Sequence, residues 1–151
     1  MFRQKVSNHV RTAVANIRGS MEYPDIHAAV RFTQKTNGVL VALQAEGLPP
    51  NKVLGFHIHN GVSCRGNSID VFAEAGGHYN PTGAEHPYHA GDLPPIFSNN
   101  GTAYMTVLTN RFTVREIAGK AIIIHDGRDD FTSQPSGDSG NKIACGIIHI
   151  G

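Results

Sequence analysis

The sequence, 151 residues long, lacks the features of three large classes of protein. It has no apolar run approaching the roughly 18 residues of a transmembrane helix, so we expect no membrane span. It has no basic block interleaved with aromatic residues, and its 13 Lys and Arg nearly balance 12 Asp and Glu, so we expect no nucleic-acid partner. Residues 1–20 contain no apolar core of about 7 to 15 residues and do not form a signal peptide. We therefore expect a cytoplasmic protein, or a secreted or cell-envelope protein if an export signal has been removed.

Cysteine is scarce, since Cys64 and Cys145 are the only two. In a cytosolic protein two thiols stay reduced by default, and two small buried thiols are then the simplest interpretation. If the two were bridged, they would close a loop of about 80 residues, for which the chain-entropy model gives about 4 to 5 kcal/mol of stabilisation. Number and spacing alone leave both alternatives open.

Glycine and proline, by contrast, are frequent. Seventeen Gly and eight Pro, with short runs of Val, Ile and Thr, favour an all-β protein with many tight turns. A chain of this length buries enough surface for one core, so we expect a polar lead over residues 1–12 and a single domain over residues 13–151. Apolar and alternating segments predict about eight short strands, at residues 13–18, 26–34, 39–45, 53–59, 102–109, 112–117, 121–125 and 143–150.

Two long segments without regular periodicity interrupt the strands, at residues 61–92 and 126–142. Loops of this length in a compact domain are usually functional. Residues 55–92, which include the first loop, contain five of the nine histidines. Because successive side chains of a strand alternate, His57 and His59 would share one face while Phe56 and Ile58 point to the other. One face would coordinate a ligand and the other would pack against the core.

The histidines together indicate metal binding, although each one alone has an ordinary structural explanation. Six imidazoles and the carboxylate of Asp92 suffice for two nitrogen-rich sites suited to copper and zinc. The spacing of three residues from His86 to His89, and again from His89 to Asp92, allows a tight turn to bring these ligands to one ion. The last imidazole, that of His125, comes from a later predicted strand.

Five motifs resemble those of one family, the copper-zinc superoxide dismutases. GFHIH, GGHYNP, HAGDLP, IIIHDGRDD and ACGII occur in the family's order, and the similarity extends from residue 13 to the C-terminus. The chain is similar to the bacterial type, with shortened zinc and electrostatic loops. The resemblance implies an eight-stranded antiparallel Greek-key β-sandwich or barrel in which two long functional loops build the site.

The resemblance also implies the ligands of two metal ions. Copper would be bound by four histidines, namely His57, His59, His78 and His125. Zinc would be bound by His78, His86, His89 and Asp92. The shared ring would bridge both ions as an imidazolate, because bound metals compete with protons for its nitrogens.

The implied activity is the dismutation of superoxide to dioxygen and hydrogen peroxide by alternate reduction and reoxidation of copper, with zinc as a structural and electrostatic partner. His78 would take up a proton in one half of the reaction and return it in the other. Asp129 would orient one copper-binding and one zinc-binding histidine, and Cys64 and Cys145 would form a disulfide. Lys142 stands where the family has an arginine. It keeps the positive charge that attracts superoxide but lacks the planar guanidinium group, which can donate two parallel hydrogen bonds. A homodimer is a further expectation.

Departures from the family leave alternatives open. Only Pro87 and Tyr88 separate His86 from His89, so either both histidines reach one zinc or one of them is displaced. His149, in the last predicted strand, receives no role. The alternatives to a dismutase are a copper or zinc carrier on the same fold without efficient turnover, and a structural module that uses zinc alone. The complete set of copper ligands favours the dismutase.

Overall fold

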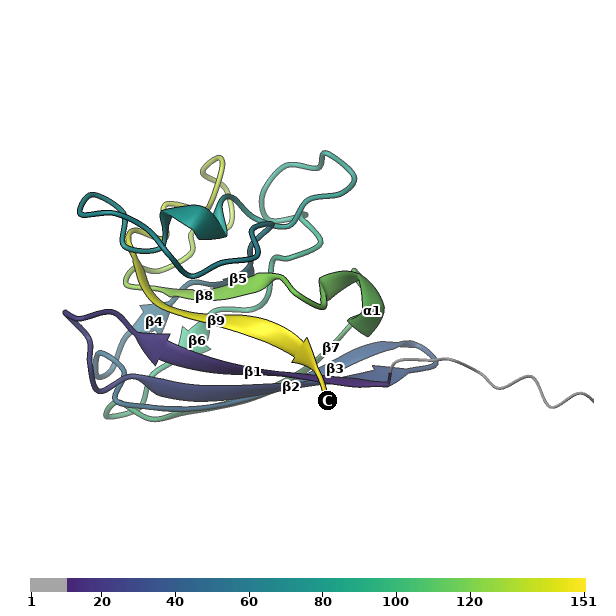
Figure 1. The fold of residues 1–151 in the computed structure, drawn as a ribbon, viewed down its shortest axis with the longest axis horizontal. Helices are drawn as coiled ribbons and strands as arrows, with labels where there is room; N and C mark the ends of the chain where they lie inside the picture. The colour runs from purple at the N-terminus through teal and green to yellow at the C-terminus, as the bar shows by residue number, and fades with distance from the viewer. Residues whose placement is uncertain (1–10) are drawn as a thin grey trace, which may run out of the picture.

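The structure is a computed structural model that describes residues 11–151. This part of the chain contains nine β-strands, one short α-helix and one 3-10 helix. Its two long loops lie on one side of the main sheet (Figure 1). The strands are β1 (Thr12–Gly19), β2 (His27–Lys35), β3 (Gly38–Glu46), β4 (Val53–Leu54), β5 (Phe56–Ile58), β6 (Ile96–Phe97), β7 (Ala103–Thr109), β8 (Ala121–His125) and β9 (Lys142–Ile150). The helices are η1 (Ala73–Ala75) and α1 (Val114–Ile117).

The main sheet is antiparallel and has the strand order β5-β8-β9-β1-β2-β3-β7, while β4 and β6 pair separately. Its strands follow from the alternation in the sequence. Ala28, Val30 and Phe32 of β2 are buried, and the residues between them are exposed. Val30 pairs with Ala15 of β1 and with Leu43 of β3, which are also buried. One face of the sheet therefore encloses the apolar core. Strands β1 and β9, the first and last in the chain, pair with each other.

Strand β8 differs because all five of its residues are buried. Ile124 belongs to the main core, whereas Ile123 packs on the opposite face in a second apolar cluster. Phe72 and Ala75 of the first long loop and Cys145 of β9 complete that cluster. The loop of residues 61–92 therefore covers the outer face of the sheet at β8, which places its histidines next to the ends of β5 and β8.

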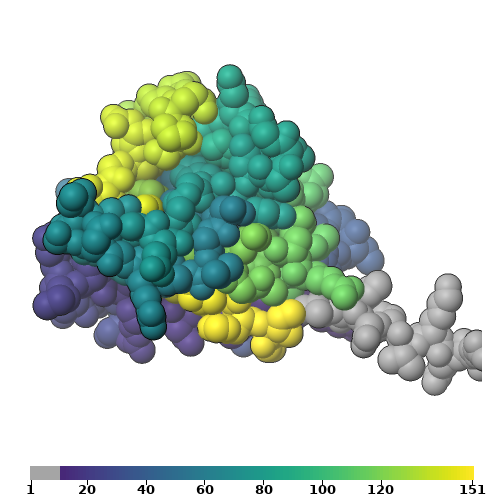
Figure 2. All heavy atoms as spheres, turned by 45° about the horizontal axis from the view of Figure 1, so that its top comes forward, coloured from purple at the N-terminus to yellow at the C-terminus, as the bar shows by residue number. Residues whose placement is uncertain are grey.

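Cys64 and Cys145 form a disulfide between the first long loop and β9, across a sequence separation of 81. The bridged alternative is therefore confirmed. Figure 2 shows the two long loops, coloured teal and yellow-green, gathered on one face of the molecule. The disulfide ties one of them to the sheet.

The predicted fold class is confirmed, with three corrections in detail. Residues 112–117 are not an extended piece, because Thr113 and Glu116 form a capping box that begins helix α1. The single strand predicted at 53–59 divides at Gly55, whose N–H donates to the carbonyl of Gly127 at 2.8 Å. On either side of this break β4 pairs with β6, a strand that was not predicted, and β5 pairs with β8. The loss of the strand at 112–117, the division at Gly55 and the addition of β6 together give nine strands instead of eight.

The polar lead predicted over residues 1–12 falls almost wholly in residues 1–10, outside the described part, and β1 begins at Thr12. Among residues 11–151, neither helix has the length and apolar character needed to span a membrane.

Candidate metal centre

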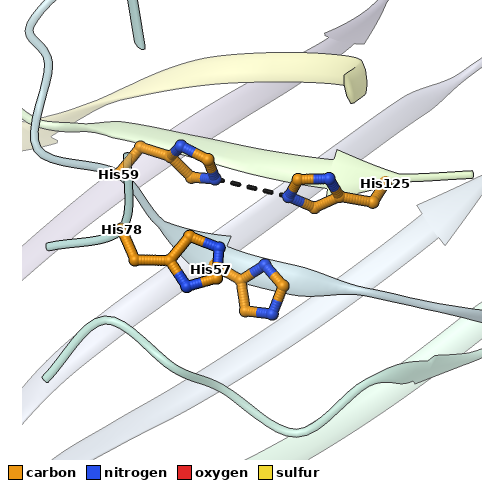
Figure 3. Close-up of side chains that lie close together, drawn as sticks. All are labelled: His57, His59, His78 and His125. Carbon is orange, nitrogen blue, oxygen red and sulfur yellow. Dashed lines mark hydrogen bonds between the residues drawn. The ribbon is translucent and has the colours of Figure 1, made fainter. Parts of the chain in front are cut away.

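Four histidines, here called the copper group, converge where β5 and β8 end (Figure 3). His57 lies in β5 and His59 follows two residues later, so strand alternation places both rings on one side. His125 ends β8, the antiparallel neighbour of β5. His78 comes from the first long loop and is held beside His59 by a β-bridge. Ligand atoms of the four rings lie within 4.8 Å of one another.

In three of the four rings, one nitrogen is hydrogen-bonded to an oxygen atom of the protein. His57 Nε2–H donates to Asp129 Oδ2 at 2.8 Å, and His59 Nδ1–H donates to the carbonyl of Gly76 at 2.7 Å. His125 Nδ1–H faces the carbonyl of Gly140 at 3.3 Å. These contacts fix the orientation of each ring and leave the opposite nitrogen available, as outer partners do for metal-binding histidines.

The opposite nitrogens point toward one another instead of toward donors or acceptors of the protein. His57 Nδ1 and His78 Nε2 are buried and have no hydrogen-bond partner. His59 Nε2 and His125 Nε2 have only each other, at 3.3 Å. A buried polar atom without a partner costs about 1 to 3 kcal/mol. Convergent imidazole nitrogens of this kind fit a copper ion, for which imidazole is a suitable ligand.

A second group, here called the zinc group, surrounds Asp92. Its carboxylate oxygens lie 2.8 Å from Nδ1 of His78, 3.1 Å from Nδ1 of His86 and 3.3 Å from Nδ1 of His89. Nδ1 of His86 is buried and has no hydrogen-bond partner. Three imidazoles and one carboxylate match the tetrahedral nitrogen and oxygen set that zinc prefers. With only two residues between them, His86 and His89 both lie within 3.3 Å of the carboxylate of Asp92.

The second set of residues whose ligand atoms all lie within 4.8 Å of one another is His57, His78, His86 and Asp92, so by this measure His57 takes the place expected for His89. The cause is stacking, because the rings of His57 and His78 have centroids 4.0 Å apart. His57 has only one nitrogen left after its bond to Asp129. His89, with Nδ1 3.1 Å from Nδ1 of His78, could therefore supply the remaining ligand of the zinc group.

Asp129 connects the two groups. Its Oδ2 accepts from His57, and its Oδ1 accepts from His86 Nε2–H at 2.7 Å. Burial alone would raise the pKa of Asp129, but the hydrogen bonds from these two rings lower it below its ordinary range. The backbone of Gly137 lies against this link, and a Cβ there would be 2.0 Å from Asp129 Oδ1. Asp129 is therefore ionised and fixed between one ring of each group.

Comparison with known proteins identifies the family to which this site belongs. The family model for copper/zinc superoxide dismutase matches residues 26–148. The chain belongs to this family.

Two curated relatives show how far the similarity to the dismutase family extends. Superoxide dismutase (Cu-Zn) 2 of Aquifex aeolicus (strain VF5) is 38% identical over 139 residues, which are 82% of this chain and 80% of the relative. Superoxide dismutase (Cu-Zn) of Escherichia coli (strain K12) is 36% identical over 134 residues, 80% of this chain and 77% of the relative. Among solved structures, a double mutant of a SOD-like protein from Bacillus subtilis is 29% identical with a TM-score of 0.74, covering 89% of this chain and 95% of that one.

Three histidines of the copper group, His57, His59 and His125, are neutral at physiological pH. Burial lowers the pKa of His57 to about 4, even though its bond to Asp129 raises it. Burial, followed by the nearby ring of His57, lowers the pKa of His125 to about 3. Burial also holds the pKa of His59 well below the ordinary value. Neutral imidazoles have the lone pair that a metal requires.

The metal-free protein should lose stability as the pH falls from 7 to 5. The pKa values of His57, His59 and His125 are lower in the folded state, so below about pH 6.5 the unfolded chain binds more protons. Their stabilising contribution is present above the unfolded pKa and is lost as the pH falls toward the folded values. We expect a loss of about 1 to 2 kcal/mol per histidine, measured by urea denaturation at each pH. A free energy of unfolding that stays constant over this range would contradict the argument.

Asp129→Asn should lower the affinity for copper and zinc by about 10- to 100-fold, the usual effect of removing an outer partner of metal ligands. An amide has one acceptor oxygen, so only one of the two rings would keep its hydrogen bond. Competition with a chelator at pH 7 measures both affinities. Asp130→Asn is the matched control, because within residues 11–151 the carboxylate of Asp130 accepts hydrogen bonds from Thr132 and Ser133 and from no histidine. Equal affinities in the two variants would remove the role assigned to Asp129.

Lys142, expected to attract superoxide, lies at the rim of the copper group. It lines a cavity of about 650 Å³ together with His59, His78 and His125. Its ammonium is paired with Asp70, whose Oδ2 accepts from Nζ at 2.6 Å. His149, by contrast, is exposed in β9 and lies in neither metal group.

Several residues that position the site were not predicted from the sequence. Gly76 and Gly140 act through backbone carbonyls, which carry no side-chain signal. The side chain of Gln134, in the second long loop, bonds both the N–H and the C=O of His86 at 2.8 Å. Its only signal was its place in a loop expected to be functional. Asp70 likewise lies in none of the five motifs.

Proposed function

We propose that the protein is a copper-zinc superoxide dismutase that converts superoxide to dioxygen and hydrogen peroxide. Copper is held by the copper group, His57, His59, His78 and His125. Zinc is held by the zinc group, His78, His86, His89 and Asp92. Membership of the family and the two convergent donor sets support this proposal.

The single observation that carries the proposal is the position of His78 between the groups. Its Nδ1 lies 2.8 Å from Asp92 Oδ1, in the zinc group. Its Nε2 is buried without a partner among the copper-group rings. One imidazole that offers a nitrogen to each of two groups is the arrangement that a bridging ligand requires. A carrier for one ion has no need of it.

Bound copper supplies the one-electron exchange with superoxide, and bound zinc supplies a second positive charge at His78. His78 can take up a proton at Nε2 and give it back without leaving its place, because its Nδ1 stays on the side of Asp92. Formation of hydrogen peroxide consumes two protons, so a ring that holds a proton at the reacting end is useful. Asp129 keeps the rings of His57 and His86 from rotating. Lys142 supplies a positive charge near the cavity that the substrate enters.

Reconstitution with both metals tests the proposed function. We expect one copper and one zinc per chain by elemental analysis, and rapid decay of superoxide followed in a stopped-flow instrument. Protein reconstituted with zinc alone is the control and should leave the spontaneous decay unchanged. Tight copper binding without accelerated decay would favour the carrier, and one zinc without copper would favour the structural module.

We also propose that the protein works in an oxidising compartment and forms a homodimer. The disulfide between Cys64 and Cys145 supports the first part, since such bonds persist outside the reducing cytosol. Cell fractionation tests the compartment, and recovery of the protein only with cytosolic markers would oppose it. Sedimentation equilibrium tests the dimer, for which we expect twice the 16.2 kDa of one chain. A mass of one chain at micromolar concentration would oppose it.

A further inference from the structure

Asp70 is a charged residue near the copper group that neither metal site uses. It lies in the first long loop and lines the same cavity of about 650 Å³ as His59, His78 and His125. Its Oδ2 accepts a hydrogen bond from Lys142 Nζ at 2.6 Å, between residues 72 positions apart. The side chain of Lys142 is only 16% exposed, so its ammonium is partly shielded from water and engaged with one carboxylate.

The carboxylate of Asp70 is held in place by its own loop. Oδ1 accepts from the N–H of Phe72 at 3.1 Å, and the N–H of Asp70 donates to Asn67 Oδ1 at 2.9 Å. The backbone of Gly66 closes against the same turn, where a Cβ would lie 2.2 Å from the carbonyl oxygen of Asp70. The pair with Lys142 therefore does not depend on a mobile acidic side chain.

The charge of the cavity wall makes this pair important for an anionic substrate. Within residues 11–151 the wall contains three carboxylates, those of Glu22, Asp70 and Asp126, but only one Lys or Arg side chain, that of Lys142. Asp126 is committed to the backbone N–H of Asn141 at 2.8 Å. Apart from the metal ions of the proposed site, an anion that enters therefore meets the single cationic side chain of Lys142, which is already paired with Asp70. The negative charge of Asp70 therefore weakens the attraction between Lys142 and an entering anion.

We propose that Asp70 is a positioning residue that sets how strongly small anions are drawn to the copper group, by holding Lys142 in a neutral pair. Removing the carboxylate frees a cation at the mouth of the site and raises the rate of superoxide capture. The choice of superoxide rests on the proposed function, whereas the effect of the pair applies to any small monovalent anion.

Asp70→Asn tests the proposal, because the amide keeps the shape and the acceptor for Phe72. In the copper-zinc protein we expect kcat/KM for superoxide at low ionic strength to rise about two- to fivefold and its decrease with added salt to become steeper. The dissociation constant of azide, titrated through the copper absorption, should fall by a similar factor. Lys142→Met should abolish both gains in the Asp70→Asn background.

Glu22→Gln is the matched control, since it removes one negative charge from the same cavity wall without touching Lys142. We expect it to change the azide constant by less than about 1.5-fold. An azide constant unchanged by Asp70→Asn, a gain of equal size in Glu22→Gln, or a gain that survives Lys142→Met would each overturn the proposal.

Asp70→Ser, which keeps an acceptor oxygen near Phe72, replaces the asparagine variant if that one fails to fold. If copper binds but superoxide decay is not catalysed, the proposed function fails while the azide titration still decides the role of Asp70.

Discussion

Replacing His78 by alanine should lower the rate of superoxide decay by more than about 100-fold. Loss of an outer partner already costs about 10- to 100-fold in metal affinity or activity, and His78 offers a nitrogen to both metal groups. The substitution also removes the ring stacked on His57, whose centroid is 4.0 Å away. We therefore expect impaired binding of both metals, measured by elemental analysis after dialysis, together with the loss of activity in stopped-flow assays.

His149→Ala is the matched control for this prediction. His149 is exposed in β9 and lies in neither metal group, so this variant should retain both metals and the full rate. A His78→Ala protein that binds one zinc and one copper with native affinity would show that His78 does not connect the two groups.

Replacing both Cys64 and Cys145 by serine should lower the free energy of unfolding of the metal-free protein by about 4 kcal/mol. The bond spans a sequence separation of 81, and cross-linking so long a loop removes much of the conformational entropy of the unfolded chain. Native domains of this size have only about 5 to 15 kcal/mol in total, so the loss is large. Guanidinium denaturation of the oxidised protein and the double variant measures the difference.

The disulfide also bears on the site itself. It anchors the loop whose Phe72 and Ala75 cover the outer face of β8, and the carbonyl of Gly76 in that loop orients His59. Reduction of the native protein with a thiol reagent should reproduce the instability of the double variant. A loss below about 1 kcal/mol in both cases would mean that packing of the loop, not the covalent bond, holds it on the sheet.

Much of the copper group was predictable because its signals are local or repeated. Extended backbone from β5 to the residue after it places His57 and His59 on one face, because successive side chains alternate. The apolar run that ends at His125 marks β8 directly. The resemblance to the dismutases then supplied His78 as the link between groups, which residue spacing alone would not have selected.

Other features could not be predicted, for physical reasons that differ. Helix α1 was missed because four residues give no usable periodicity, and only its capping box of Thr113 and Glu116 pointed to a helix. The pair of Asp70 and Lys142 joins two loops 72 residues apart, and neither residue has a pattern that names its partner. Long-range contacts of this kind are known only once the fold brings the loops together.

Anomalous diffraction at the copper and zinc edges, from crystals of the reconstituted protein, tests whether His78 joins a copper ion to a zinc ion. We expect two metal peaks on opposite sides of the His78 ring, with copper near Nε2 and zinc near Nδ1. The zinc peak should lie about 2.0 to 2.1 Å from Nδ1 of His78, His86 and His89, the usual zinc–nitrogen distance. A single peak, or a copper peak that His78 does not reach, would contradict this expectation.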